Sequence, residues 1–321
     1  MSANLTQDRQ RLQSAVWFTL RAVITLGLLG YVASRVDLTA LAQRLREARP
    51  GCLILAFSVL LAQVFVAASR WNFVNVRLLY RIGYPSCLRY TFEGLFFGQM
   101  LPSSVGGDVL RVWRARQHGM PLAVATTGVF LDRLSALIAV LFAVLIGMPL
   151  LFKKVEIPGF AEAVGVLLGT AFVGLVSLVV LDRIALLPRH WHVTTLLHRL
   201  AADSRTLFIH PLTSFILLAY SSLVLVLTAL SLYWIAVGLS VPLDLLDALL
   251  FTPLVVLITI LPISIAGWGV REFGMATLLV HVGVSATEAV SLSLVQGLML
   301  LAVSFPGAVL WTTTRGYMDR A

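Results

Sequence analysis

Apolar runs long enough to cross a lipid bilayer recur along most of the chain. A helical span needs about 20 mostly apolar residues. Six segments meet that requirement, namely residues 17–34, 51–69, 123–152, 163–181, 211–243 and 289–314. The pattern therefore predicts about six transmembrane helices.

Two further apolar stretches do not fit the pattern of a simple span. Residues 94–107 would form a helix of about 21 Å, which is shorter than the ~30 Å hydrocarbon core. Residues 248–270 are long enough, but Pro253, Pro262, Gly267 and Gly269 interrupt them. Irregular backbone is tolerated inside a bilayer only where protein or water satisfies it. Each stretch is therefore predicted to form a re-entrant or broken helical hairpin.

The two interrupted stretches resemble each other. Residues 101–111, LPSSVGGDVLR, align without gaps on residues 261–271, LPISIAGWGVR, at a constant offset of 160. Three predicted spans separate the copies, so the second would enter from the opposite face. This is the signature of an inverted-topology repeat, whose interrupted helices usually mark a transport site. Chance similarity is the alternative, because Leu-Pro followed by glycine is common in membrane helices.

The fold class predicted from these patterns is an all-α polytopic membrane protein. It has about six full transmembrane helices, two re-entrant or broken hairpins and an inverted-repeat architecture. We expect residues 1–321 to form a single domain, with repeat halves of roughly 15–160 and 161–315. Composition agrees, because 59% of the residues are apolar and 12% are charged, against roughly 25% charged in soluble domains.

The net charge of +9 helps to orient the chain in the membrane. With a cytoplasmic N-terminus and both hairpins returning to their own side, 16 of the 24 basic residues fall in the cytoplasm. Basic residues favour cytoplasmic loops. We therefore expect a multi-pass protein of the bacterial inner membrane with both termini cytoplasmic. The basic residues lie among apolar spans, which favours contact with anionic lipid over nucleic acid.

Several kinds of chemistry have no motif in this sequence. There is no GxxxxGK[ST] phosphate-binding loop, HExxH zinc motif or GxSxG nucleophile motif, so we predict no catalytic residues, cofactor or metal. Four histidines lie in the predicted loop 182–210, but without cysteines or carboxylates at ligand spacing. That loop is predicted to be solvated and to face the lipid headgroups.

The tips of the two hairpins are the candidate substrate site. Half-helix ends inside a bilayer offer free N–H groups and the positive end of a dipole, which suit a phosphate or carboxylate. Glycines at the tips let backbone approach a ligand closely, and two arginines follow them at matching spacing. The candidate binding residues there are Ser104, Gly106, Gly107, Arg111, Ser264, Gly267, Gly269 and Arg271. For Arg111, ordinary cytoplasmic anchoring is the alternative.

Charged residues at membrane depth complete the candidate site. Asp132 and Arg133 lie within a predicted span, where ionisable side chains are costly and usually functional. Arg133 is expected to face a cavity and bind substrate, with a structural pair to Glu93 as the alternative. Orienting or ion-coupling roles are predicted for Asp108, Asp132, Glu272 and Glu93. Arg70, by contrast, is interpreted as an interfacial anchor at the end of its span.

Four motifs in order resemble the lysylphosphatidylglycerol synthase transmembrane-region family over roughly residues 15–315. They are Arg70-Trp71, Phe97-x-x-Met100-Leu101-Pro102 with Gly106-Gly107-Asp108-x-x-Arg111, Leu131-Asp132-Arg133-Leu134, and Leu261-Pro262 with Gly267-x-Gly269-x-Arg271-Glu272. The resemblance implies translocation of a lipid or lipid-linked headgroup, or a membrane partner of lipid-modifying enzymes. Departures from the family pattern are Met100, Asp108, Asp132 and Trp268.

The function that we expect is flipping of an anionic or lipid-linked headgroup across the membrane. One alternative is an intramembrane transferase of an aminoacyl-lipid, glycolipid or hopanoid pathway, with Asp108, Glu272 or Glu93 as base. The other is an accessory subunit that anchors a lipid-modifying enzyme. The expected partners are thus a membrane lipid or lipid-linked substrate and a lipid-modifying enzyme.

Overall fold

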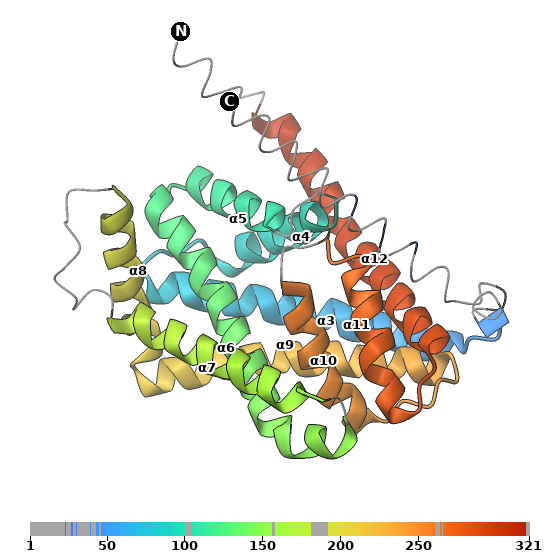
Figure 1. Cartoon of the computed structure of the whole chain (residues 1–321). Coiled ribbons are helices and arrows are strands. Elements are labelled where there is room, and N and C mark those ends of the chain that lie inside the picture. The colour runs from blue at the N-terminus through green and yellow to red at the C-terminus, as the bar shows by residue number, and fades with distance from the viewer. Residues whose placement is uncertain are drawn as a thin grey trace, which may run out of the picture.

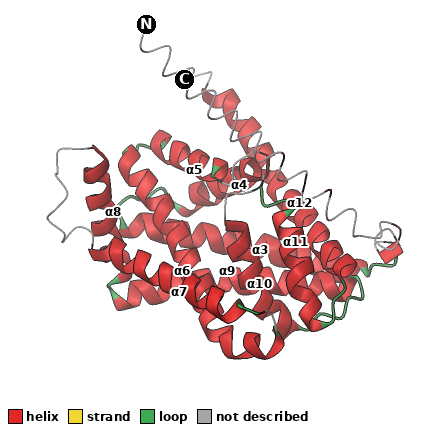
Figure 2. Cartoon of the chain, in the orientation of Figure 1, coloured by secondary structure: helices red, strands yellow, loops and turns green. Residues whose placement is uncertain are grey.

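A computed structural model describes residues 46–100, 105–155, 158–180, 192–260 and 266–318, with positions 23, 27, 30, 39, 43, 44 and 264. Helices connected by short loops make up this part of the chain, and it contains no strand (Figures 1 and 2). The helices are α3 (Pro50–Arg77), α4 (Tyr84–Met100), α5 (Gly106–Gln117), α6 (Leu122–Lys154), α7 (Phe160–Val180), α8 (His192–Phe208), α9 (Pro211–Gly238), α10 (Leu245–Ile260), α11 (Val270–Leu278), the 3-10 helix η2 (Leu279–Val282) and α12 (Ala286–Met318).

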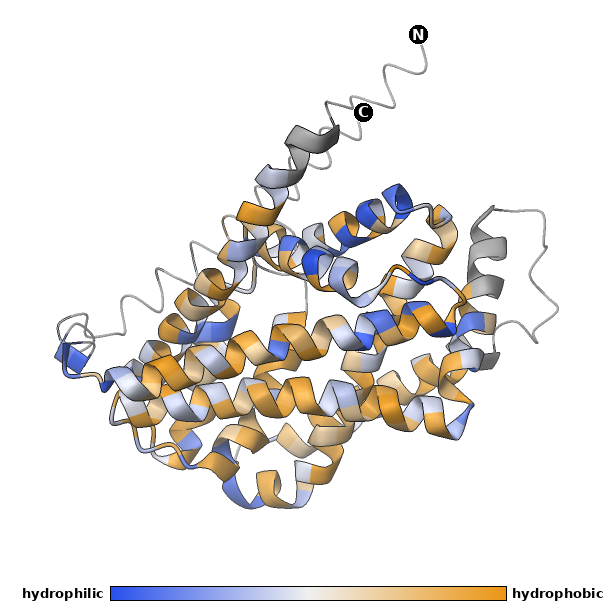
Figure 3. Cartoon of the chain, turned by 180° about the vertical axis from the view of Figure 1, so that it is seen from behind, coloured by the Kyte–Doolittle hydropathy of each residue, from blue (hydrophilic) through white to orange (hydrophobic). Residues whose placement is uncertain are grey.

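Five of the predicted spans are confirmed as long apolar helices. Helices α3, α6, α7, α9 and α12 are each long and apolar enough to cross a membrane. Apolar residues cover most of their surface, and polar residues gather toward the helix ends and on α5 (Figure 3). The sixth predicted span, residues 17–34, lies almost wholly outside the described residues. The protein is therefore an all-α polytopic membrane protein.

Helices α3 and α9 form an antiparallel pair through the middle of the bundle (Figure 1). The start of α3 meets the end of α9, where the Arg49 N–H donates to the Gly238 carbonyl at 2.9 Å. Both helices have a proline in the first turn, where its fixed φ suits a helix start. Both end in a left-handed residue, Leu79 or Ser240, which turns the chain away from the helix axis.

The first interrupted stretch is a two-helix hairpin made of α4 and α5. Its entry and exit lie together, because Ile82 and Cys87 pack in one apolar cluster with Ala115 and Met120. Trp71, near the end of α3, belongs to the same cluster. The hairpin therefore begins and ends at the C-terminal end of α3.

The second interrupted stretch, α10 and α11, lies at the other end of α3. Its entry and exit, represented by Leu243 and Leu279, share a cluster with Ala56 from the first third of α3. The two hairpins thus enter the bundle from opposite ends of the same helix. The interruption falls between Ile260 and Val270, where Ala266, Gly267 and Gly269 have positive φ.

Two predicted boundaries are wrong for identifiable reasons. Pro253 does not interrupt the second stretch but lies inside α10; neighbouring helices compensate for such breaks in membrane proteins. Glu93 does not bound the first apolar stretch but lies inside α4 and is fully buried. Its charge is tolerated there because two arginines bind it.

The predicted loop 182–210 is also partly wrong, because α8 occupies residues 192–208. Ala201, Ser204 and Leu207 recur at a spacing of three residues and are all buried. Leu207 packs in a cluster with Val74 of α3 and Leu217 of α9. An amphipathic pattern of this kind forms a helix when a bundle covers its apolar side.

Candidate functional site

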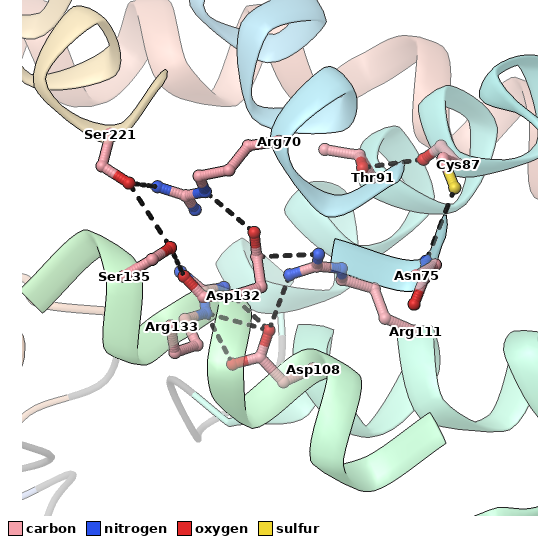
Figure 4. Close-up of polar contacts among 10 residues, drawn as sticks. All are labelled: Arg70, Asn75, Cys87, Thr91, Asp108, Arg111, Asp132, Arg133, Ser135 and Ser221. Atoms are coloured by element: carbon pink, nitrogen blue, oxygen red, sulfur yellow. Dashed lines mark hydrogen bonds and ion pairs between the residues drawn. The ribbon is translucent and has the colours of Figure 1, made fainter. Parts of the chain in front are cut away.

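A buried carboxylate, Asp132 of α6, lies between two arginines from other helices (Figure 4). Arg70 of α3 donates through Nε to Asp132 Oδ1 at 2.8 Å. Arg111 of α5 donates through Nη2 to the other oxygen, Oδ2, at 2.9 Å. The side chains of all three residues are at most 7% exposed. One carboxylate therefore ties together α3, α5 and α6.

Asp108 forms the outer part of the same network. Arg133 donates to it through Nε at 3.0 and 2.8 Å and through Nη2 at 2.8 Å. Arg111 reaches Asp108 Oδ1 with Nη1 at 3.4 Å. Asp132 and Arg133 are adjacent in sequence, but successive helical side chains point about 100° apart, so they bind different partners.

The position of Arg111 depends on close packing within the α4–α5 hairpin. Its guanidinium lies 4.2 Å from the centre of the Trp71 ring, a favourable cation–π arrangement. Gly107 and Gly94 bring the two helices together, because a Cβ on Gly107 would overlap the Gly94 carbonyl. Two glycines facing each other therefore set how far α5, and with it Arg111, reaches into the bundle.

Two serines extend the network to the second half of the chain. Arg70 Nη1 donates to Ser221 Oγ of α9 at 3.1 Å, and the Ser221 hydroxyl contacts Ser135 Oγ at 3.4 Å. Ser135 in turn donates to the backbone carbonyl of Asp132 at 2.8 Å. The network thus crosses the α3–α9 pair that lies in the middle of the bundle.

The network carries one positive charge more than its carboxylates neutralise. It contains Arg70, Arg111 and Arg133 against Asp108 and Asp132. Asp132 lies about 15 Å along α6 from Leu122, which is about half the thickness of a hydrocarbon core. A surplus cation at that depth favours an anionic ligand, since an uncompensated charge in low dielectric is costly.

A second charged cluster holds the hairpin to α12. Arg114 of α5 binds Glu93 of α4 with two bonds, at 2.6 and 3.1 Å. Arg89 donates to the same carboxylate at 3.0 Å and to the backbone carbonyl of Leu310 in α12 at 3.0 Å. The Arg114 guanidinium lies 4.6 Å from the Trp311 ring centre. Glu93 thus contacts these arginines and not Arg133, which corrects the alternative pairing.

A third cluster lies at the start of α11 in the second hairpin. Arg271 Nη2 contacts Glu272 Oε1 at 2.8 Å, and its Nε donates to Ser293 of α12 at 2.9 Å. The Arg271 guanidinium also lies 5.0 Å from the Trp268 ring centre. Glu272 Oε2 accepts the Gly269 N–H at 2.6 Å. The carboxylate of Glu272 therefore occupies the N-terminus of α11, where an external anion would otherwise bind.

Replacing Glu272 by glutamine is expected to lower the free energy of unfolding by about 2 kcal/mol. The substitution keeps the cap partly, but it removes the charge that pairs with buried Arg271. Unfolding followed by circular dichroism in mixed detergent micelles measures the loss. Glu288→Gln is the matched control, because Glu288 also accepts a backbone N–H at the start of a helix but is less buried. If both variants lost the same free energy of unfolding, the buried pair of Glu272 with Arg271 would not be the cause of the loss.

The structure brings some candidate residues together and separates others. Asp108, Arg111, Asp132 and Arg133 share one network, with Gly107 packed behind it and Gly106 preceding it. Glu93 lies in the α12 cluster, and Arg271, Glu272 and Gly269 form the α11 cluster with Gly267 beside it. Ser264 is buried, and in the part of the chain that the structure describes its hydroxyl has no hydrogen-bond partner, whereas Ser104 lies outside that part. Among the described residues no group of three or more metal-ligand side chains occurs.

Several residues of these clusters escaped the sequence prediction, among them Arg70, Arg114 and Ser293. Arg70 was interpreted as an interfacial anchor, yet it is 4% exposed and binds Asp132. Arg114 was counted among cytoplasmic charges, and Ser293 has no charge to draw attention. Arg70 was missed because the predicted span ended at residue 69, whereas α3 continues to Arg77 and places Arg70 about 10 Å inside the helix.

The family model described as lysylphosphatidylglycerol synthase TM region matches residues 18–307. The matched range includes all three charged clusters apart from Leu310 and Trp311 of α12. No curated protein matches the chain.

Proposed function

Since the chain belongs to the lysylphosphatidylglycerol synthase transmembrane-region family, we propose that it flips an anionic or lipid-linked headgroup across the bacterial inner membrane. The headgroup would rest against the Asp132 network, while its acyl chains stay in the bilayer. The family and the apolar helices support a multi-pass membrane protein, and the family points to lipid modification or a flippase-like function. What we propose in addition is that the protein flips its substrate, that this substrate is an anionic or lipid-linked headgroup, and that the membrane is the bacterial inner membrane.

The surplus positive charge at membrane depth is the observation that carries the proposal. Three arginines and two aspartates from α3, α5 and α6 meet about a third of the way along α6 from Leu122. Ionisable groups inside a bilayer are retained mainly where they bind a substrate or ion. A stabilising role alone would be served better by apolar packing, because buried ion pairs contribute little net stability.

An inverted repeat, part of the same proposal, is supported by the helix lengths. Helices α3 and α9 both have 28 residues, α6 and α12 both have 33, and α4 and α10 have 17 and 16. The pair α3 and α9 is antiparallel, and the hairpins enter from opposite ends. In such architectures one half rocks against the other about a fixed site. We propose the halves 15–160 and 161–315, with both termini in the cytoplasm.

Transport is tested with purified protein in liposomes that contain fluorescent phosphatidylglycerol. Wild-type vesicles are expected to expose the inner-leaflet label to a membrane-impermeant quencher, whereas empty vesicles do not. Arg133→Gln is expected to slow this exchange by about tenfold or more, because a charge-assisted contact to phosphate contributes about 1.5–3 kcal/mol.

Lys154→Gln is the matched control for that measurement. Lys154 also pairs with a carboxylate, Asp247, at 2.6 Å, but it lies about 32 Å along α6 from Arg133. It should behave like wild type. The proposal fails if wild type and empty vesicles give the same exchange for phosphatidylglycerol, cardiolipin, phosphatidylethanolamine and a lipid-linked sugar.

The transferase alternative requires a carboxylate that is free to act as a base. Asp108, Glu93 and Glu272 each accept hydrogen bonds from arginine, so each carboxylate is already held by a cation. This arrangement supports binding over proton abstraction. An accessory role beside a lipid-modifying enzyme would instead show itself as co-purification with that enzyme and tolerance of Arg133→Gln in cells.

A further inference from the structure

The Arg133–Asp108 pair is the one part of the Asp132 network that opens to the surroundings. The Arg133 side chain is 58% exposed, whereas Asp108 is 17% and Asp132 2% exposed. Val109 follows Asp108 and is 61% exposed, and Phe130, one helical turn before Arg133, is 42% exposed. An ion pair flanked by exposed apolar side chains, in a protein that spans a membrane, faces a region that lipid tails can reach.

Asp108 has a second cation within reach. Arg111 Nη1 already lies 3.4 Å from Asp108 Oδ1. The buried Nε of Arg111 has no hydrogen-bond partner among the described residues, so this guanidinium keeps unused donor capacity. A small rotation of the Asp108 side chain would therefore exchange Arg133 for Arg111 without leaving the carboxylate unpaired.

That exchange would leave the surplus positive charge of the network on Arg133. With Asp108 on Arg111, the two aspartates match Arg70 and Arg111, and Arg133 alone remains. One negative charge then completes neutrality. A phosphodiester carries one negative charge, whereas a phosphomonoester carries about −1.5 to −2 at pH 7. A neutral headgroup carries no charge that could replace the Asp108 carboxylate as the partner of Arg133.

We propose that Asp108 is a latch on Arg133, which a lipid phosphodiester displaces so that Asp108 moves to Arg111. This inference rests on the proposed function and specifies its substrate class as lipids with a single phosphodiester group. Arg133 donates two hydrogen bonds to the phosphate, through Nε and Nη2, as it does to the Asp108 carboxylate in the structure. Asp108 thereby competes with the ligand for Arg133.

Calorimetric titration of the full chain in detergent with dihexanoyl phosphatidylglycerol tests the latch. Asp108→Asn is expected to tighten binding by about fivefold, the upper range for a partly exposed ion pair. Arg133→Gln is expected to weaken it by about tenfold or more. In the double variant the gain from Asp108→Asn should disappear, because the latch acts only through Arg133.

Two comparisons make the result specific. Asp247→Asn removes the carboxylate partner of Lys154, which is 35% exposed, and should leave binding unchanged. Dihexanoylglycerol, which lacks the phosphate, and inorganic phosphate, which lacks the acyl chains, should both bind at least about tenfold more weakly than the lipid. Equal binding of inorganic phosphate would overturn the assignment to a lipid.

The latch is overturned if Asp108→Asn does not tighten binding, or if the gain persists in the double variant, which would indicate a general field effect. Because binding is measured without a bilayer, its outcome is separate from that of the transport assay. Binding with the expected pattern but no transport would refute the flippase proposal and keep the latch. Transport by the wild type, combined with an affinity that Asp108→Asn leaves unchanged, would refute the latch and keep the flippase proposal.

Discussion

Substituting Asp132 by alanine is expected to lower the free energy of unfolding by about 3–5 kcal/mol. Asp132 is 1% exposed and accepts hydrogen bonds from Arg70 and Arg111. Its removal leaves Arg70 with only the neutral Ser221 and Arg111 with the more distant Asp108. An arginine has no neutral form at accessible pH, so neither charge is relieved by losing a proton.

Unfolding in mixed detergent micelles, followed by circular dichroism, measures this loss. Asp132→Asn should be less damaging than Asp132→Ala, because the amide oxygen still accepts one hydrogen bond. The double variant Arg70→Met with Asp132→Leu should recover a large part of the stability, since replacing a whole buried ion pair by apolar residues is often neutral or stabilising. A double variant no more stable than Asp132→Ala would show that the ion pair is not the cause.

Gly107→Ala is expected to lower the free energy of unfolding by about 3 kcal/mol, the upper range for overpacking. The added Cβ would overlap the carbonyl of Gly94, and the atoms in the way are backbone, which cannot rotate aside. Helix α5 would have to move away from α4. Arg111 and Asp108 lie on α5 in the next turn, so the displacement would also weaken binding at the Asp132 network.

The same unfolding measurement tests this prediction, together with the lipid titration. Gly165→Ala is the matched control, because Gly165 also lies within a helix but a Cβ there meets no atom within 4 Å. That control should change stability little or raise it slightly, since alanine favours helix over glycine. If Gly107→Ala were as mild as Gly165→Ala, the close contact of α4 and α5 would not set the hairpin geometry.

Much of the helical architecture followed from the order of apolar and polar residues. Five spans were predicted at their observed places, because a segment inside a bilayer must be a long, mostly apolar helix. The end of α3 was misplaced, since this helix continues to Arg77 and not to residue 69. The interruptions near residues 101 and 261 were predicted from proline followed by glycine. Pro253 carried the same signal and was misleading, since a helix in a packed bundle accommodates a missing N–H donor.

The charged clusters were only partly predictable. Asp132, Arg133 and Arg111 stood out because each lies near membrane depth or at a repeated position. Their partners could not be derived, since Arg70 and Asp132 are 62 residues apart in sequence and Arg89 meets α12 across 221 residues. Pairings over such separations depend on which helices become neighbours, and hydrophobic periodicity does not specify neighbours.

By itself, the sequence determined that this protein lies in a membrane, which five described helices are long and apolar enough to cross it, where two helices are interrupted, and which family it resembles. Those properties follow from local composition and spacing, because transfer into a bilayer is decided segment by segment. Only the tertiary structure decided that Arg70 binds Asp132, that Glu93 binds the two arginines that contact α12, and that Asp108 lies between two arginines. These are choices among several cations of similar charge, and they are made by distance and direction once the helices have packed.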